Sequence, residues 1–282
     1  MTGSPPSLLT VEDLRVTFHT PTGPVRAVRG VSFSLGREKL GIVGESGSGK
    51  SITGRSILRL LPRSAEVTAT RLEFDGVDLM RASDRQMREI RGRRISLVLQ
   101  DPTYSHNPVM TVGDQNAEAY RLHAKVGGAA ARRRAIEMLG AVRIRDPERV
   151  YGLYPHEVSG GMGQRIMIAM MLIPEPDLLI ADEPTSALDV TVQMQVLAIL
   201  DDLVTTRGMG LIFISHDLNL VASFCDRILV MYAGRVVEAC RASELHAATH
   251  PYTRGLLESL PRIDDDRAEL PTLRRDPAWA AE

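Results

Sequence analysis

Residues 44–51 have the sequence GESGSGKS, and this segment carries the strongest structural signal in the chain. It fits the pattern G-x-x-x-x-G-K-[ST] of a phosphate-binding loop, in which glycines let backbone N–H groups converge on phosphate oxygens. An apolar run at 40–43 leads into the loop, and helical spacing follows over 51–61, where Pro62 ends it. The start of that helix adds its positive end to the loop. We therefore expect phosphates to be bound by Gly44, Glu45, Ser46, Gly47, Ser48, Gly49, Lys50 and Ser51.

Two side chains of the loop carry specific chemistry, and an acid pair lies downstream. Lys50 is expected to reach the β and γ phosphates of a nucleotide, and the Ser51 hydroxyl to ligate Mg²⁺.

Residues 178–183 are four apolar residues followed by Asp182 and Glu183. A buried strand ending there would place Asp182 on the metal and point Glu183 at an attacking water. Such a run alone is more commonly a strand end with solvated acids, but the upstream loop favours the catalytic interpretation.

Two further polar residues follow apolar runs that have the length of buried strands. Gln100 follows residues 95–99, and His216 follows residues 211–215. An amide at a strand end can contact both Mg²⁺ and the attacking water, and an imidazole there can hydrogen-bond the γ phosphate. Taken singly, a glutamine of this kind is more commonly a surface residue, and a histidine a structural one.

The remaining pattern alternates between strand and helix. Residues 9–18 and 25–35 have strand character, and Asp-Gly within 71–77 indicates a hairpin, because it supplies the positive-φ turn. Helical spacing dominates from about 101 to 158. Strands and helices then alternate again, over 178–181, 192–204, 211–215, from 218 onward, and in a hairpin over 227–237. This alternation predicts an α/β fold with a mainly parallel sheet.

Composition narrows the class of protein. The 282 residues are 44% hydrophobic with a formal net charge of −1, enough for one large domain or two small ones and without the basic excess typical of nucleic-acid binders. Cys225 and Cys240 are the only cysteines and form no ligand cluster in the sequence, as in a reducing cytosol. Residues 1–10 do not resemble a signal peptide, and no window reaches the about 18 apolar residues that span a bilayer. We expect a soluble protein, or one that is peripheral to a membrane through a partner.

The order of these elements resembles that of ATP-binding cassette (ABC) nucleotide-binding domains over about residues 8–261. The order is phosphate-binding loop, Gln100, Ser159-Gly160-Gly161, the acid pair, the segment SALD at 186–189, and His216. The resemblance implies a P-loop NTPase (RecA-like) core of mainly parallel sheet, an N-terminal antiparallel β subdomain and a helical insertion. It places the nucleotide-binding domain at residues 1–262, its helical subdomain at about 101–158, and a C-terminal tail at 263–282.

The same resemblance assigns roles to the residues that match the motifs. Ser159, Gly160 and Gly161 would form a signature loop that contacts the γ phosphate bound by an opposing subunit, and Asp189 would line the interface. The catalytic residues would be Glu183, His216 and Gln100, and the metal ligands Ser51, Gln100 and Asp182. The implied cofactors are ATP and Mg²⁺, and no nucleic acid is expected as a partner.

A closer resemblance is to ATPase subunits of bacterial dipeptide, oligopeptide and nickel importers. Its most specific segment is HPYTRGLL at 250–257. It implies ATP hydrolysis coupled to uptake of di- or oligopeptides, with a nickel or other metal chelate, or an opine-like solute, as the alternative cargo. Its partners would be a second ABC ATPase subunit, in a hetero- or homodimer, two transmembrane permease subunits and an extracytoplasmic solute-binding protein. The chain would lie on the cytoplasmic face of the inner membrane.

Three positions depart from the family pattern. Gly163 stands where the subgroup has a long polar or basic residue, which predicts a looser start to the signature helix. Residues 18–20, Phe-His-Thr, occupy the place of an aromatic that stacks on adenine, and we expect Phe18 to be a core residue instead. The segment 262–282 lacks cysteine, so we expect no iron–sulfur cluster there.

Two other classes of protein also use a phosphate-binding loop. A cassette ATPase acting on DNA would place a long coiled coil between the loop and the signature, and one acting on ribosomes would carry two cassettes. A P-loop kinase would need an acceptor-binding lid and would not need a Ser-Gly-Gly loop. The sequence favours transport over both.

Overall fold

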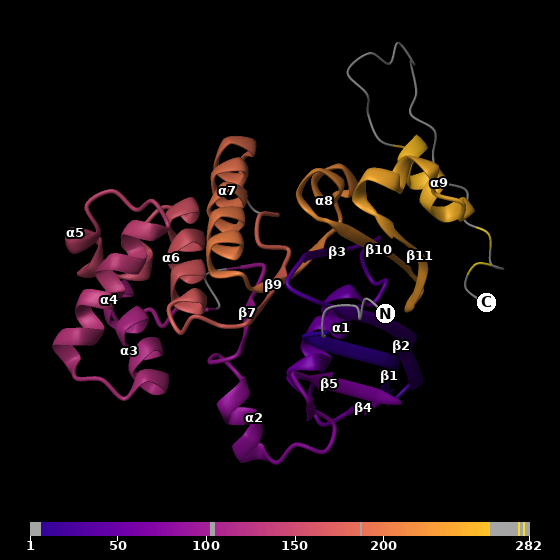
Figure 1. The fold of residues 1–282 in the computed structure, drawn as a ribbon, viewed down its shortest axis with the longest axis horizontal. Coiled ribbons are helices and arrows are strands. Elements are labelled where there is room, and N and C mark those ends of the chain that lie inside the picture. The colour runs from indigo at the N-terminus through magenta and orange to yellow at the C-terminus, as the bar shows by residue number, and fades with distance from the viewer. Residues whose placement is uncertain (1–6, 102–104, 187, 260–275, 277–278, 280–282) are drawn as a thin grey trace, which may run out of the picture. The chain divides into compact units, whose positions relative to one another are not determined.

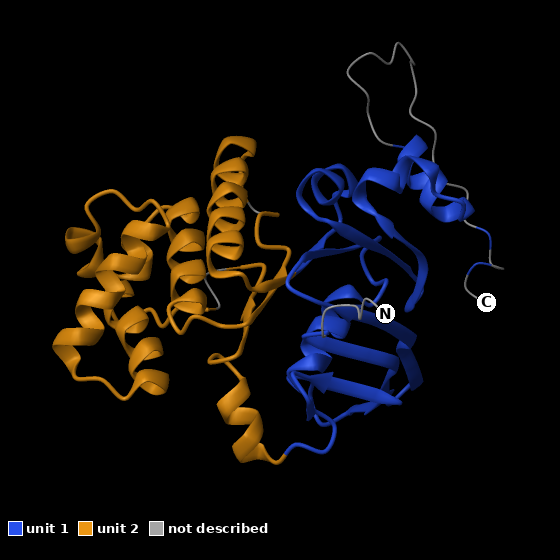
Figure 2. Ribbon diagram, viewed as in Figure 1, with its two compact units in different colours: residues 1–82, 212–282 blue, residues 83–211 orange. Residues whose placement is uncertain are grey.

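The structure is a computed structural model that describes residues 7–101, 105–186, 188–259, 276 and 279. The chain divides into two compact units, residues 1–82 with 212–282 and residues 83–211 (Figure 2). Within the described residues, no helix is long and apolar enough to cross a membrane.

The first unit contains an antiparallel sheet in the order β2-β1-β5-β6, with β4 also paired to β1 (Figure 1). Its strands are β1 (Leu9–Thr20), β2 (Gly23–Leu35), β4 (Ala65–Thr68), β5 (Arg71–Phe74) and β6 (Val77–Asp78). One face of β1 is buried through alternate apolar residues, as expected for a sheet with one face on the core. The turn between β5 and β6 has Asp75 at φ 47° and Gly76 at φ 78°, which confirms the Asp-Gly hairpin.

The first unit also carries the strands that lead into the phosphate-binding loop. β3 (Lys39–Val43) pairs in parallel with β10 (Arg227–Tyr232), and β10 forms an antiparallel hairpin with β11 (Arg235–Arg241). β3 also neighbours β9 (Gly210–Ser215) in the sheet order. Four of the five residues of β3 are buried, because helices and strands cover both faces of a parallel strand. This unit also contains α1 (Lys50–Ile57), α8 (Leu218–Phe224), α9 (Pro251–Glu258) and a 3₁₀ helix at Ala242–Ala247.

The helix after the loop is shorter than its sequence pattern predicts. α1 ends at Ile57, not at residue 61. Arg59 adopts φ 52°, and the Leu60 N–H donates to the Arg55 carbonyl at 3.0 Å. The left-handed residue turns the chain four residues early, so Pro62 follows a helix that has already ended.

The second unit joins two parallel strands to a group of helices. β7 (Ile95–Val98) and β8 (Leu178–Asp182) pair in parallel, with Val98 opposite Ala181. The helices α3, α4 and α6 contact one another, and α5 packs on α3 and α4 (Figure 1). The helices of this unit are α2 (Asp84–Ile90), α3 (Val112–Ala124), α4 (Gly128–Ala141), α5 (Pro147–Tyr151), α6 (Gly160–Leu172), α7 (Val190–Arg207) and a 3₁₀ helix at Pro155–Glu157.

The predicted α/β architecture, with an antiparallel β part and a parallel core, is confirmed. Helices α3, α4 and α5 fall within residues 101–158, the predicted helical subdomain, but the boundaries of that subdomain and of the 1–262 domain stay a prediction. Most of the predicted tail at 263–282 lies outside the described residues.

Gly41 in β3 lies where α8 packs closely against the strand. A Cβ atom there would lie 2.1 Å from Cγ1 of Val221 and 3.1 Å from Sγ of Cys225. Val221 is fully buried and β-branched, so it has little freedom to move aside. Close packing of the strand that feeds the loop therefore requires glycine at this position.

Gly41→Ala is expected to lower the free energy of unfolding by about 1–3 kcal/mol, because a methyl group overpacks this contact. Urea denaturation monitored by circular dichroism measures the change. Gly36→Ala is the matched control, because a Cβ there meets nothing within 4 Å. Equal stability of the two variants would show that the α8 contact does not constrain β3.

Candidate functional site

The predicted phosphate-binding loop at residues 44–51 follows β3, includes the first two residues of α1, and lies close against backbone on two sides. Gly44 has φ 156°, and a Cβ atom there would lie 2.1 Å from the Met231 carbonyl oxygen. Gly49 has φ 100°, and its Cβ would lie 2.6 Å from the Ala27 carbonyl oxygen. No side chain fits at either position, so both glycines are required by backbone conformation and by space.

Lys50 is held inside this loop. Its side chain is 5% exposed, and Nζ donates to the carbonyls of Gly44 at 2.7 Å and Glu45 at 2.9 Å. The Ser48 hydroxyl is buried and has no hydrogen-bond partner among the described residues. An ammonium and an unsatisfied hydroxyl therefore lie together in a loop with a helix N-terminus behind it, which is a setting suited to an anion.

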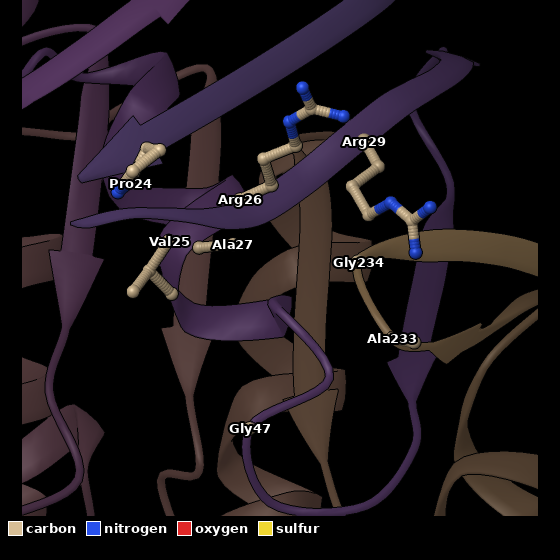
Figure 3. Close-up of a pocket in the computed structure, with 8 residues that line it drawn as sticks. All are labelled: Pro24, Val25, Arg26, Ala27, Arg29, Gly47, Ala233 and Gly234. Atoms are coloured by element: carbon tan, nitrogen blue, oxygen red, sulfur yellow. The ribbon is translucent and has the colours of Figure 1, made fainter. Parts of the chain in front are cut away.

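A cavity of about 610 Å³ lies beside the loop, between Gly47, the turn at 233–234 and the start of β2. Figure 3 shows Val25 and Ala27 on the side of β2 that faces Gly47, whereas Arg26 points to the other side. Val25 is 53% exposed. The cavity therefore offers an apolar side chain next to the glycine loop.

Phe18 lies directly opposite Val25 in the β1–β2 register. Facing residues of antiparallel strands share one face of the sheet, so the two side chains lie on the same side. Phe18 is half-buried rather than a core residue. The expectation that it belongs to the core is wrong, because the burial of β1 falls off after Val16 and no later residue of the strand is fully buried.

In the second unit, Gln100 and the acid pair lie at the same edge of the β7–β8 pair. Gln100 comes two residues after Val98, and Asp182 one residue after Ala181, the partner of Val98. Asp182 ends β8 and is 3% exposed, whereas Gln100 is exposed. Parallel pairing therefore places at one edge of the sheet the amide and the carboxylate that the sequence placed at two strand ends.

Glu183 has an unusual backbone. Its φ is 49°, in the left-handed region that non-glycine residues rarely adopt. Its carbonyl accepts hydrogen bonds from the Ser186 N–H at 3.4 Å and from the Ser186 hydroxyl at 3.2 Å. A strained conformation held by a turn immediately after a buried carboxylate is typical of a functional site.

Ser159, Gly160 and Gly161 form the N-terminus of α6. Ser159 is the N-cap, and its Oγ accepts from the Met162 N–H at 3.4 Å. The Gly163 N–H donates to the Ser159 carbonyl at 2.8 Å, so the first turn is regular. The loosening expected from Gly163 stays a prediction. Gly163 is buried, and its carbonyl lies 3.3 Å from Nε2 of His106, a residue that the sequence did not single out.

His216 lies in the first unit, immediately after β9, and its side chain is exposed. The adjacent Asp217 caps α8 by accepting from the Leu220 N–H at 3.0 Å, and its own N–H donates to the Ser215 hydroxyl at 3.0 Å. These bonds fix the backbone on both sides of His216.

The predicted site residues thus form two local groups. The loop at 44–51 and His216 belong to the first unit, and Gln100, Asp182, Glu183 and the Ser159 loop belong to the second. Sequence reasoning did not identify Tyr252 as a residue that contacts the loop at 44–51. Its hydroxyl accepts a hydrogen bond from the Glu45 N–H at 3.2 Å, and the two residues lie 207 positions apart in the sequence. The segment HPYTRGLL had marked its neighbourhood without giving it a role.

Residues 28–186 match the ABC transporter family. The chain is 53% identical to the "Probable peptide ABC transporter ATP-binding protein y4tR" of Sinorhizobium fredii, over 95% of this chain and 83% of that protein. It is 51% identical to the dipeptide transport ATP-binding protein DppD of Bacillus subtilis, over 93% and 79%. It is 45% identical to the oligopeptide transport ATP-binding protein OppD of Salmonella typhimurium, over 96% and 81%.

A solved structure shares the fold. The ATP-binding cassette MJ0796, in a dimeric post-hydrolysis state bound to ADP and Pi, superposes with a TM-score of 0.73 at 25% identity, over 83% of this chain and 98% of that one. The sequence identities and the covered lengths confirm the predicted resemblance: this chain belongs to the ABC transporter family.

Proposed function

We propose that this chain is the ATP-hydrolysing subunit of an importer of di- or oligopeptides. The observation that carries the proposal is the loop at 44–51, whose glycines lie against backbone and whose Lys50 ammonium is buried in the loop. Relatives at 45–53% identity that are named as peptide-transport ATP-binding proteins support the choice of cargo.

The loop would hold the phosphates of ATP. Lys50 would exchange its bonds to the Gly44 and Glu45 carbonyls for the β and γ phosphates, and the Ser48 hydroxyl would gain a partner. The backbone N–H groups of residues 44–51 and the start of α1 would supply the remaining contacts.

A magnesium ion would fit the donor atoms that these residues offer. Ser51, Gln100 and Asp182 carry hydroxyl, amide and carboxylate oxygens, the hard ligands that Mg²⁺ prefers. Asp182 is almost fully buried at the end of β8, and a buried carboxylate is generally paired or bound to a metal. When bound, the ion would neutralise charge that develops on the phosphates.

Glu183, Gln100 and His216 would act on the water and on the γ phosphate. Glu183 is fixed by its left-handed backbone, which sets the direction in which its carboxylate leaves the chain. It would orient and polarise the attacking water, and Gln100, on the same strand edge, would hold that water. His216 would hydrogen-bond the γ phosphate.

The signature residues would act on ATP held by a second subunit. Ser159 and Gly160 are exposed at the N-terminus of α6, a 13-residue helix whose positive end favours an anion. ATP shared between two subunits would favour the closed dimer, and hydrolysis would release it. The structure of MJ0796, the ATP-binding cassette that shares this fold, has been solved as a dimer.

The adenine would rest on the apolar side chains beside the cavity of Figure 3. Phe18 is half-buried, and Val25, its cross-strand partner, lines the cavity next to Gly47. An aromatic ring at the outer end of a phosphate loop offers a stacking surface for a base.

The proposed partners are a second ATPase subunit, two permeases and an extracytoplasmic binding protein. The chain would bind the permeases peripherally on the cytoplasmic face of the inner membrane, through the helices within residues 101–158. Gln100, which immediately precedes this segment, would link the contact with the permeases to the γ phosphate.

Glu183→Gln is expected to keep ATP binding and to reduce ATP hydrolysis by about 100-fold or more, because the amide cannot polarise the attacking water. Phosphate release and isothermal titration with ATP measure the two properties separately, and size-exclusion chromatography with ATP reports the trapped dimer. Near-normal turnover would exclude the catalytic role of Glu183.

Lys50→Ala is the comparison variant for this experiment. It removes the ammonium that would contact the phosphates, so ATP binding itself should be lost. A variant that binds ATP as tightly as the wild type would contradict the assignment of the phosphate loop.

Phe18→Ala is expected to weaken ATP binding about tenfold, because it removes the stacking surface for adenine. Leu122→Ala is the matched control, since Leu122 is an exposed apolar residue in the helix α3, at 72% exposure. Titration with ATP checks both variants. If affinity for ATP is equal in the two, the base does not stack on Phe18.

The transport role predicts a complex with two hydrophobic permease proteins whose genes lie with that of this chain. Co-purification from membranes, followed by ATPase assays with the solute-binding protein loaded with a peptide or with a nickel chelate, identifies both the complex and the cargo. Stimulation by the peptide-loaded protein is expected. Stimulation by the nickel-loaded protein alone would assign the alternative cargo, and isolation without permeases would contradict the role in transport.

A further inference from the structure

The segment at 250–257 is fixed against β11, the second strand of the β10–β11 hairpin. His250 caps α9, with its Nδ1 accepting from the Tyr252 N–H at 3.1 Å. The carboxylate of Glu238, in β11, accepts from the His250 N–H at 2.8 Å and from the Thr249 N–H at 3.1 Å. The backbone that carries Tyr252 is therefore held at a defined position in the first unit.

The Tyr252 ring is enclosed by other aromatic rings. It is fully buried, and its centroid lies 4.5 Å from that of Tyr232, the last residue of β10. Trp279 lies edge-on to both tyrosines, at 6.2 Å from Tyr252 and 6.1 Å from Tyr232. These contacts leave the ring little freedom, so the hydroxyl points in one direction.

The Tyr252 hydroxyl points to the loop at residues 44–51. The Tyr252 hydroxyl accepts a hydrogen bond from the Glu45 N–H at 3.2 Å. The carbonyl of the same residue accepts from Nζ of Lys50 at 2.9 Å. The backbone of Glu45 is thus bonded through its N–H to Tyr252 and through its carbonyl to the lysine that would contact phosphate.

We propose that Tyr252 is a positioning residue for ATP binding, whose hydroxyl fixes the backbone of Glu45 and thereby the place of Lys50 and of the loop. The inference rests on the proposed function, because it assigns a support to the same ATP site.

Tyr252→Phe tests this role because it removes the hydroxyl and keeps the ring packing. The loss of one hydrogen bond that pre-organises the loop should raise KM for ATP about three- to tenfold. The kcat should stay within about twofold of the wild-type value, since Tyr252 does not reach the reacting atoms. A purely structural role would lower the melting temperature and leave KM unchanged at temperatures well below melting.

Trp279→Ala is the matched control, because it opens the same aromatic cluster without touching the hydroxyl bond. Its KM for ATP should rise less than that of Tyr252→Phe, because Tyr232 and the capped start of α9 still hold the ring and its hydroxyl bond. If it raises KM as much as Tyr252→Phe does, packing of the cluster, and not the hydroxyl, sets the loop, and the proposal is overturned. Should Tyr252→Phe fail to fold, Tyr252→Met removes the hydroxyl and the ring together, and its KM for ATP should rise at least as much as is expected for Tyr252→Phe. An unchanged KM in that variant would overturn the proposal.

Wild-type protein and Lys50→Ala in the same assays separate this inference from the proposed function. If the wild type does not bind ATP, both fail. If the wild type binds ATP, Lys50→Ala does not, and Tyr252→Phe has an unchanged KM, only the positioning role of Tyr252 fails.

Discussion

The first unit depends on how closely the loop at 44–51 lies against neighbouring backbone. The Gly234 N–H donates to the Ser48 carbonyl at 3.0 Å, and the Gly234 carbonyl accepts from the Arg29 N–H at 2.7 Å. One hairpin turn thus ties the loop to β2 and so to the antiparallel sheet. Because a loop that presents N–H groups to an anion uses few of its own groups for internal bonds, external backbone contacts must hold its shape. The glycines at 44 and 49 are the local consequence, since side chains there would break these contacts.

A different constraint shapes the carboxylate edge in the second unit. Asp182 is buried at the end of a fully buried strand, and the next residue turns sharply into a left-handed conformation. The turn separates the two carboxylates after a single peptide bond, so they face different surroundings. A buried acid and a half-buried acid on adjacent residues suit the different tasks proposed for them, one toward a metal and one toward water.

The sequence predicted those parts of the fold that depend on short-range patterns. The apolar run before the loop, the Asp75–Gly76 turn and the hairpin around Ala233 and Gly234 all lie where expected, because neighbouring residues determine them. The end of α1 was missed because Arg59 takes a left-handed conformation without the glycine that normally announces one. Exposure of Phe18 depends on the β1–β2 register, which shifts at three places and cannot be counted from one strand.

The candidate site was predictable to the same extent. Positions of the loop, Gln100, the acid pair and His216 follow from strand ends that local pattern reveals. The Tyr252–Glu45 contact joins residues 207 apart, and no periodicity connects them. Such a contact forms only when the β10–β11 hairpin and α9 fold against the loop, so it can be found only in the structure.

The two signature glycines differ in what the single chain requires of them. A Cβ atom on Gly161 would lie 2.7 Å from Cγ1 of Val192, so the packing of α6 on α7 already demands a small residue there. A Cβ on Gly160 would meet nothing within 4 Å, and the residue has no positive φ. Packing within this subunit therefore explains Gly161 and gives no reason for Gly160. A ligand approaching the exposed start of α6 from outside the chain, as proposed for ATP on a second subunit, would supply that reason, because close approach to backbone N–H groups is what a missing side chain permits.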